Sequence, residues 1–298
     1  MQSNDISLLH QARSKLYERL KQDRILAIVN SSNGLIANIA DKSSRASRDI
    51  SLSVFEALNA PLVDKKVAGQ SAGKCFEYAI RDYLQETFPN LQNIRPGKWF
   101  IKDLGNRNHV KLSDFAQYEH LHHLTEIANK DSELAAALGN DYMIAPDIII
   151  ARDLYTDAEL NAKVQVVDPE TSTLADIRRR YEDQPLILHA SVSAKWTMRT
   201  DRAQNTRTEA LNLIRNRKGS LPHIVAVTAE CLPNRLSSLA LGTGDIDCVY
   251  HIALYELKNA VYEYARKEQA PELREAIDTL IDGHRLKDIT DLPLDLGI

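Results

Sequence analysis

The first third of the chain repeats its apolar positions with the period of an α-helix. Leu9, Ala12, Leu16 and Leu20 recur at spacings of three or four residues, which places them on one face of a helix. Similar patterns predict helices at residues 6–29, 46–60 and 69–88. We therefore expect residues 1–95 to form a mostly helical N-terminal part.

Beyond residue 95 the pattern changes to short apolar or β-branched runs, which is typical of strands buried on both faces. The runs are GKWFIKDL, YMIAPDIIIARDL, AKVQVVD, PLILHASVSAKW and LPHIVAVTAE, and helical patterns lie around them at 112–138, 201–217, 247–266 and 271–284. Helices on both flanks of a mixed central sheet predict a three-layer α/β/α core over residues 96–298. Because no repeat or linker interrupts the chain, we expect residues 1–298 to form a single domain.

Composition narrows the class of protein. The 298 residues are 44% hydrophobic and 26% charged, as in ordinary globular proteins. No apolar run approaches the roughly 18 residues of a membrane span, and the first twenty residues lack the apolar segment of a signal peptide. The three cysteines, Cys75, Cys231 and Cys248, lie far apart, which argues against a disulfide framework. We expect a cytoplasmic protein that does not contact a membrane.

Charge is distributed unevenly along the chain. The formal net charge is −4, yet residues 195–218 carry seven Lys and Arg residues against two acids. Because salt screens charges beyond about 8–10 Å, a local basic face is sufficient to attract phosphates. This segment therefore indicates an anionic partner. The three arginines at 178–180 could touch a DNA backbone or form a solvated charge run.

Polar residues lie at the ends of two predicted strands. Asp147 follows a proline at the start of one strand, and Ser193 and Lys195 point to the same side of another, because side chains alternate along a strand. Each has an ordinary explanation by itself: a turn for the aspartate, and an apolar stem with a solvated head for the lysine. Beside a carboxylate, however, a lysine can orient water and stabilise developing negative charge.

A cation could join these residues to acids on helices. Glu209 lies on the helix that follows Lys195, where it could also be a solvated glutamate paired with arginines. If that helix packs back on the strand, Asp147, Glu209 and the carbonyl of Ala194 would suit Mg²⁺, which prefers oxygen ligands. Glu77, in the helix predicted at 69–88, could supply a further acid.

The order P-D, S-x-K and then a glutamate on the next helix resembles a known motif. It is the variant PD-(D/E)xK motif of the CCGG family of type II restriction endonucleases, where serine replaces the usual acid. RTDR (Arg199, Asp201, Arg202) resembles the R-x-D-R element with which that family reads CCGG. The chemistry agrees, since arginine suits guanine O6 and N7 and aspartate accepts from cytosine N4. One departure from the wider superfamily is the 46-residue interval between Asp147 and Ser193.

The resemblance covers most of the chain and is closest to the family member that recognises GCCGGC. It implies a restriction-endonuclease-like fold, Mg²⁺ as cofactor and double-stranded DNA as substrate. It also implies that Asp41, Gln70 and Arg235 read the outer G·C pair. The expected assembly is a homotetramer of two back-to-back dimers, and a cytosine methyltransferase is expected as its genetic companion.

Two other functions remain open at this point. A repair or recombination nuclease of the same fold would cut junctions or mismatches with little base preference. A non-catalytic DNA-binding regulator would bind without Mg²⁺-dependent nicking, and it would leave Lys195 and Glu209 without a role.

Overall fold

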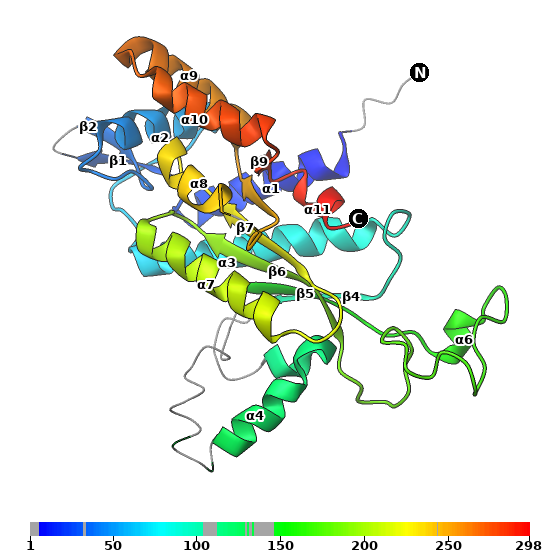
Figure 1. Ribbon diagram of the computed structural model, residues 1–298. Coiled ribbons are helices and arrows are strands. Elements are labelled where there is room, and N and C mark those ends of the chain that lie inside the picture. Colours follow the sequence, from blue (N-terminus) through cyan, green and yellow to red (C-terminus); the bar gives the residue numbers. More distant parts are fainter. Residues whose placement is uncertain are drawn as a thin grey trace, which may run out of the picture.

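The computed structural model describes residues 6–31, 34–103, 112–128, 130, 133, 146–242 and 244–298. At its centre lies a six-stranded sheet in the order β4-β5-β6-β7-β8-β9 (Figure 1). The strands are β4 (Trp99–Asp103), β5 (Ile148–Arg152), β6 (Ile187–Lys195), β7 (His223–Thr228), β8 (Cys248–His251) and β9 (Leu286–Asp288). The pairs β4/β5 and β5/β6 are antiparallel, and β6 to β9 are parallel. This mixed sheet confirms the predicted fold class.

Helices cover both faces of this sheet. The α-helices of the described residues are α1 (Leu8–Gln22), α2 (Arg45–Ala57), α3 (Gly69–Thr87), α4 (His120–Ala128), α6 (Asp157–Leu160), α7 (Thr200–Asn216), α8 (Pro233–Ala240), α9 (Leu254–Glu268), α10 (Pro271–Asp282) and α11 (Leu292–Asp295). The short 3-10 helices are η1 (Phe88–Asn90), η2 (Leu112–Asp114) and η3 (Ala116–Tyr118). Helix α3 lies behind the sheet in Figure 1 and α7 lies in front of it. Among the helices of the described ranges, none is both long and apolar enough to cross a membrane.

Alternation along β6 and its continuation directs side chains to these two helices. The ring of Trp196 lies 5.3 Å from that of Phe76 on α3. The hydroxyl of Ser193 lies 3.2 Å from that of Thr206 on α7. Since odd- and even-numbered residues of a strand face opposite sides, Lys195 is directed with Ser193 toward the α7 side.

The N-terminal part contains a small sheet that the sequence pattern did not predict. Its order is β2-β1-β3, with β1 (Ile28–Ser31), β2 (Gly34–Ala37) and β3 (Leu62–Val63). The helix predicted to residue 29 is therefore too long, because α1 ends at Gln22. Residues 25–29 are a continuous buried apolar run, which fits a buried strand at least as well as a helix. One hydrophobic core joins this part to the large sheet.

Two other predicted elements differ from the structure. Residues 162–168 were expected to form a strand, but no strand forms there. Instead, the side-chain Oδ1 of Asn161 accepts hydrogen bonds from the N–H groups of Val166 and Val167 at 2.8 and 2.9 Å. Residues 247–266 were predicted to form one helix, but they contain strand β8 followed by most of α9. The pattern did not separate these elements, because a run as short as β8 is compatible with either a helix or a strand. Part of the helix predicted at 112–138 lies outside the described residues.

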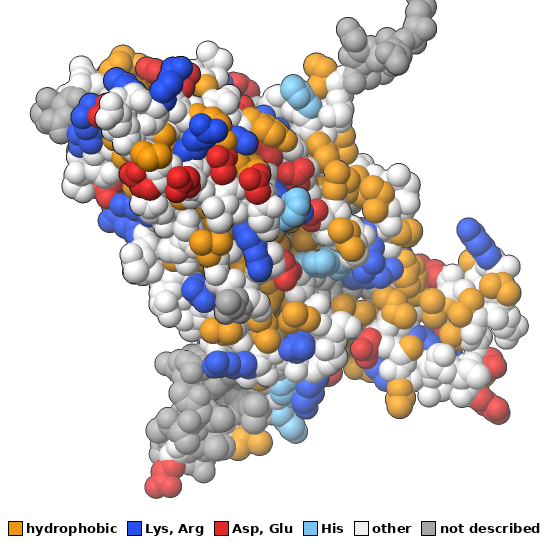
Figure 2. Space-filling view, turned by 45° about the horizontal axis from the view of Figure 1, so that its top comes forward, with side chains coloured by type: hydrophobic (Ala, Val, Ile, Leu, Met, Phe, Trp, Pro, Cys, Tyr) orange, Lys and Arg blue, Asp and Glu red, His pale blue; other side chains and the backbone are white. Residues whose placement is uncertain are grey.

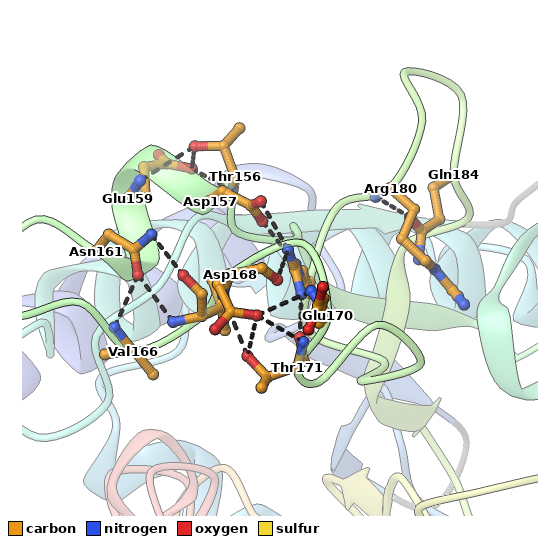
Figure 3. A network of polar contacts seen from close by, with 12 residues as sticks. Thr156, Asp157, Glu159, Asn161, Val166, Asp168, Glu170, Thr171, Arg180 and Gln184 are labelled. Atoms are coloured by element: carbon orange, nitrogen blue, oxygen red, sulfur yellow. Dashed lines mark hydrogen bonds and ion pairs between the residues drawn. The ribbon is translucent and has the colours of Figure 1, made fainter.

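The connection between β5 and β6 forms an arm, residues 153–186, that projects from the sheet (Figure 1). Its turns are tied internally by polar contacts, several of which are drawn in Figure 3. The guanidinium of Arg178 donates to both carboxylate oxygens of Asp157 at 2.6 and 2.7 Å and to the carbonyl of Asp168 at 2.9 Å. Arg178 is 6% exposed, so it is buried in the arm and stabilises it. For this arginine, both contact with a DNA backbone and a solvated charge run are therefore wrong predictions.

Candidate active site and DNA-reading surface

The start of β5 and the end of β6 bring three sequence-predicted residues together. Asp147 directly precedes β5, and the antiparallel register pairs Ile148 with Val192, so Asp147 lies beside Ser193. The ammonium of Lys195 donates to the two carboxylate oxygens of Asp147 at 2.8 and 3.1 Å. The N–H of Ala194 donates to Oδ2 at 2.8 Å, and the hydroxyl of Ser193 donates to it at 3.4 Å. Asp147 is therefore held in one orientation by three donors.

Helices supply two further acids to the same electrostatic environment. The pKa of Glu209 is raised to about 7: burial raises it most, the charge of Lys195 opposes this rise, and the charge of Asp147 adds to it. Burial also raises the pKa of Glu77, again with a contribution from Asp147. Lys74 lies 3.3 Å from the carboxylate of Glu77 and lowers that pKa.

The lysine responds to all three carboxylates. Burial lowers the pKa of Lys195, but the charges of Asp147, Glu209 and Glu77 together raise it above its ordinary value. The ammonium therefore stays charged at neutral pH. Three acids, Asp147, Glu209 and Glu77, lie near two cations, Lys195 and Lys74. When all three acids are ionised, negative charge is therefore in excess, and a divalent ion could neutralise it.

The donor set fits a hard divalent ion with open coordination positions. Among the residues that the structure describes, no three His, Cys, Asp or Glu side chains gather closely enough to hold a metal by themselves. Mg²⁺, however, commonly takes only one or two carboxylates and keeps several waters. Asp147, Glu209 and the carbonyl of Ala194 meet that requirement.

The β5/β6 ladder ends at the pair Ile148–Val192 and does not include Ala194. Continuing the β5/β6 register by two residues beyond the pair Ile148–Val192 places Pro146 opposite Ala194. In an antiparallel pair the N–H and C=O of one residue point to the same neighbouring strand. The carbonyl of Ala194 therefore points to the same side of β6 as its N–H, which donates to Asp147. Proline has no N–H to donate to that carbonyl. The P-D dipeptide thus interrupts the ladder beside the aspartate.

A separate hollow of about 580 Å³ gathers most of the predicted DNA-reading residues. Its lining comprises Asp41, Ser43, Arg199, Thr200, Asp201 and Arg235. Arg199 directly precedes α7, and Asp201 lies in its first turn. Since a helix N-terminus carries partial positive charge, this end of α7 suits a polyanion. The residues expected to read inner and outer base pairs therefore line one surface.

Within this hollow Asp41 and Arg235 form an ion pair across 194 residues of sequence. Hydrogen bonds from Ser43, together with Arg235, hold the pKa of Asp41 well below its usual range. Asp41 follows the small sheet, and Arg235 lies in the first turn of α8. The small sheet, which the sequence pattern missed, thus positions one of the predicted readers.

Two predicted readers lie outside the lining. Arg202 donates to the carbonyl of Thr197 at 3.3 Å and to its hydroxyl. Gln70 is an exposed residue at the start of α3. Lys66, which the sequence did not single out, is electrostatically coupled to Arg199: its pKa is lowered by desolvation and then by the charges of Lys42 and Arg199. Only its positive charge could have drawn attention to it.

Comparisons with known proteins identify the family of this chain. The model of the NgoMIV restriction enzyme family matches residues 16–298. The Type II restriction enzyme NgoMIV of Neisseria gonorrhoeae is 46% identical over 294 residues, which cover 98% of this chain and 99% of that enzyme. The chain therefore belongs to the NgoMIV restriction enzyme family of type II site-specific deoxyribonucleases.

Proposed function

We propose that this restriction endonuclease hydrolyses a phosphodiester bond in double-stranded DNA at the palindrome GCCGGC and requires Mg²⁺. The observation that carries the catalytic part is the contact of Lys195 with Asp147 beside the electrostatically coupled Glu209. Bound Mg²⁺ would supply charge neutralisation at the scissile phosphate and acidify a coordinated water. Asp147, Glu209 and the carbonyl of Ala194 would hold it.

The side chains around the scissile phosphate have separable roles. Lys195 stays protonated, so its ammonium can hold the attacking water and stabilise negative charge on the phosphate oxygens. Ser193 touches both Asp147 and Thr206, and thereby fixes the aspartate relative to α7. Glu77 would assist as an additional acid near this pair.

Base recognition is assigned to the hollow at the start of α7 and α8. Arg199 and Arg202 would read guanines of the central CCGG, and Asp201 would accept from cytosine N4. Arg235 and Asp41 lie side by side. The guanidinium would donate to a guanine, and the carboxylate beside it would accept from the cytosine paired with that guanine. Their contact supports assigning the outer pair to them. Gln70 would complete that contact from the start of α3.

The palindrome and the projecting arm support an oligomer. A two-fold DNA site is matched by a two-fold dimer. The arm exposes Val164, Val166, Leu174 and Tyr181, which are 67%, 58%, 80% and 52% exposed, and apolar side chains are visible on this projection in Figure 2. Because apolar surface on an internally tied segment suits a protein contact, we infer that the arms join two dimers into a tetramer.

The cellular setting follows from the proposed specificity. An enzyme that cuts GCCGGC in the cytoplasm would also cut the DNA of its own cell. A methyltransferase that modifies a cytosine in the same palindrome would prevent this, so we propose it as the genetic companion.

Digestion of defined DNA tests the function. Duplexes that contain GCCGGC, ACCGGT or an unrelated sequence are incubated with the enzyme and with Mg²⁺ or EDTA. We expect cleavage of GCCGGC with Mg²⁺ alone. Asp147→Asn should bind the same duplex with cleavage reduced by at least about 100-fold, since loss of a metal ligand removes metal affinity. Cutting of branched or mismatched DNA without base preference would instead indicate a repair nuclease, and binding without any cleavage would indicate a regulator.

A further inference from the structure

Glu230 is a buried carboxylate that neither the active site nor the DNA-reading surface includes. It lies two residues after β7 and is 3% exposed. We propose that Glu230 is a positioning residue for base recognition, which couples the element expected to read CCGG to the arginine expected to read the outer pair. This inference rests on the proposed recognition of GCCGGC and adds a specificity-determining residue to it.

The contacts of Glu230 reach both reading elements. Its Oε2 accepts the N–H of Met198 at 3.0 Å, and Met198 directly precedes Arg199. Its Oε1 accepts the N–H of Leu232 at 3.1 Å, and Leu232 is the N-cap residue that directly precedes α8. One side chain therefore ties the backbone before α7 to the backbone before α8.

The same carboxylate also contacts the outer-pair reader itself. The Nη1 atom of Arg235 lies 3.6 Å from Oε2 of Glu230, while Nη2 of this arginine contacts Asp41. Two carboxylates thus hold the guanidinium from two sides. Because bidentate recognition of guanine requires a fixed planar fork, this arrangement orients Arg235 before DNA arrives.

Loss of the buried charge should disturb this orientation. The N–H groups of Met198 and Leu232 bind different oxygens of Glu230, and glutamine replaces one of these oxygens by an NH2 donor, so one of the two N–H groups loses its acceptor. It also leaves Arg235 held by Asp41 alone, and Asp41 is itself expected to engage cytosine. We therefore expect selectivity for the outer base pair to fall, while the metal-binding residues are untouched.

Asp288, the last residue of β9, provides a matched control. It is fully buried and accepts the N–H groups of Thr290 and Leu254 at 3.0 and 3.2 Å. Like Glu230 it lies near an arginine, with Nη2 of Arg13 at 3.2 Å. It contacts neither reading element, so Asp288→Asn should lower stability without changing base selectivity.

The experiment compares kcat/KM for duplexes with GCCGGC and with ACCGGT in Mg²⁺. The variants are Glu230→Gln, Glu230→Asp and Asp288→Asn, each checked for folding by circular dichroism and urea unfolding. For both Glu230 variants the GCCGGC:ACCGGT ratio should fall at least about fivefold, the lower end of what one bidentate arginine contact contributes. In an Arg235→Ala background, Glu230→Gln should lower the ratio little further, because the two residues act together.

The outcomes separate this inference from the proposed function. A wild-type ratio near one would overturn the GCCGGC assignment and the role of Glu230 with it. A large wild-type ratio that persists in a folded Glu230 variant, or that falls equally in Asp288→Asn, would overturn the role of Glu230 alone. If both Glu230 variants fail to fold while Asp288→Asn folds, Glu230 is structural only and the inference is also refuted.

Discussion

Replacement of Glu209 by glutamine should make the metal-free protein more stable at alkaline pH. Glutamine has the same shape as glutamate but carries no charge, so Glu209→Gln removes the cost of an ionised carboxylate buried beside Asp147. The ordinary pKa of 4.5 rises to about 7 in the folded protein. At about 1.4 kcal/mol per pKa unit, this shift corresponds to a penalty of about 3 kcal/mol.

The sign of the pH dependence follows from proton binding. Because the folded state holds the proton of Glu209 more tightly than the unfolded state does, the penalty is absent below pH 4.5. It grows as the pH rises toward 7 and is complete above that value. We therefore expect Glu209→Gln to raise the free energy of unfolding by about 3 kcal/mol at pH 8 and by less than about 1 kcal/mol at pH 5.

Urea unfolding in EDTA at pH 8 and pH 5 measures this difference. Glu263→Gln, a change at an exposed position of α9, serves as the control and should alter stability by no more than about 0.5 kcal/mol. Added Mg²⁺ should stabilise the wild type at pH 8 more than it stabilises Glu209→Gln, because the ionised carboxylate is the expected ligand. Equal effects of Glu209→Gln at both pH values would refute the reasoning that burial and Asp147 raise this pKa.

Three further predictions address the lysine, the outer reader and the arm. Lys195→Met should preserve DNA binding and reduce single-turnover cleavage by at least about 100-fold, since a charged donor in a buried site stabilises developing charge; wild-type rates would contradict its role. Arg235→Ala should lower the preference for GCCGGC over ACCGGT by about 10- to 100-fold, as one bidentate contact contributes; an unchanged preference would remove Arg235 from the outer pair. Leu174→Glu, at an 80% exposed position, should convert tetramers into dimers in sedimentation velocity, whereas persistent tetramers would place the contact elsewhere.

Local pattern was sufficient to predict most of the large sheet and the residues at its ends. The alternation in β6 correctly placed Ser193 and Lys195 on one side, because the side-chain period of a strand is a property of the backbone alone. The helix after β6 was likewise predicted within one residue at each end, since its polar and apolar faces repeat at helical spacing. The short strands β1, β2, β3, β8 and β9 were missed, because runs of two to four residues are compatible with either structure.

The sequence by itself determined the chemical groups and their order: a P-D pair, an S-x-K strand end, a glutamate on the next helix and an R-x-D-R element. Only the tertiary structure decided which groups meet. It pairs Asp41 with Arg235 across 194 residues, brings Lys195 to Asp147, and buries Glu230 between the backbone before α7 and the backbone before α8. Such contacts depend on sheet register and on helix packing, which arise from the whole core and leave no periodic signal in the residues themselves.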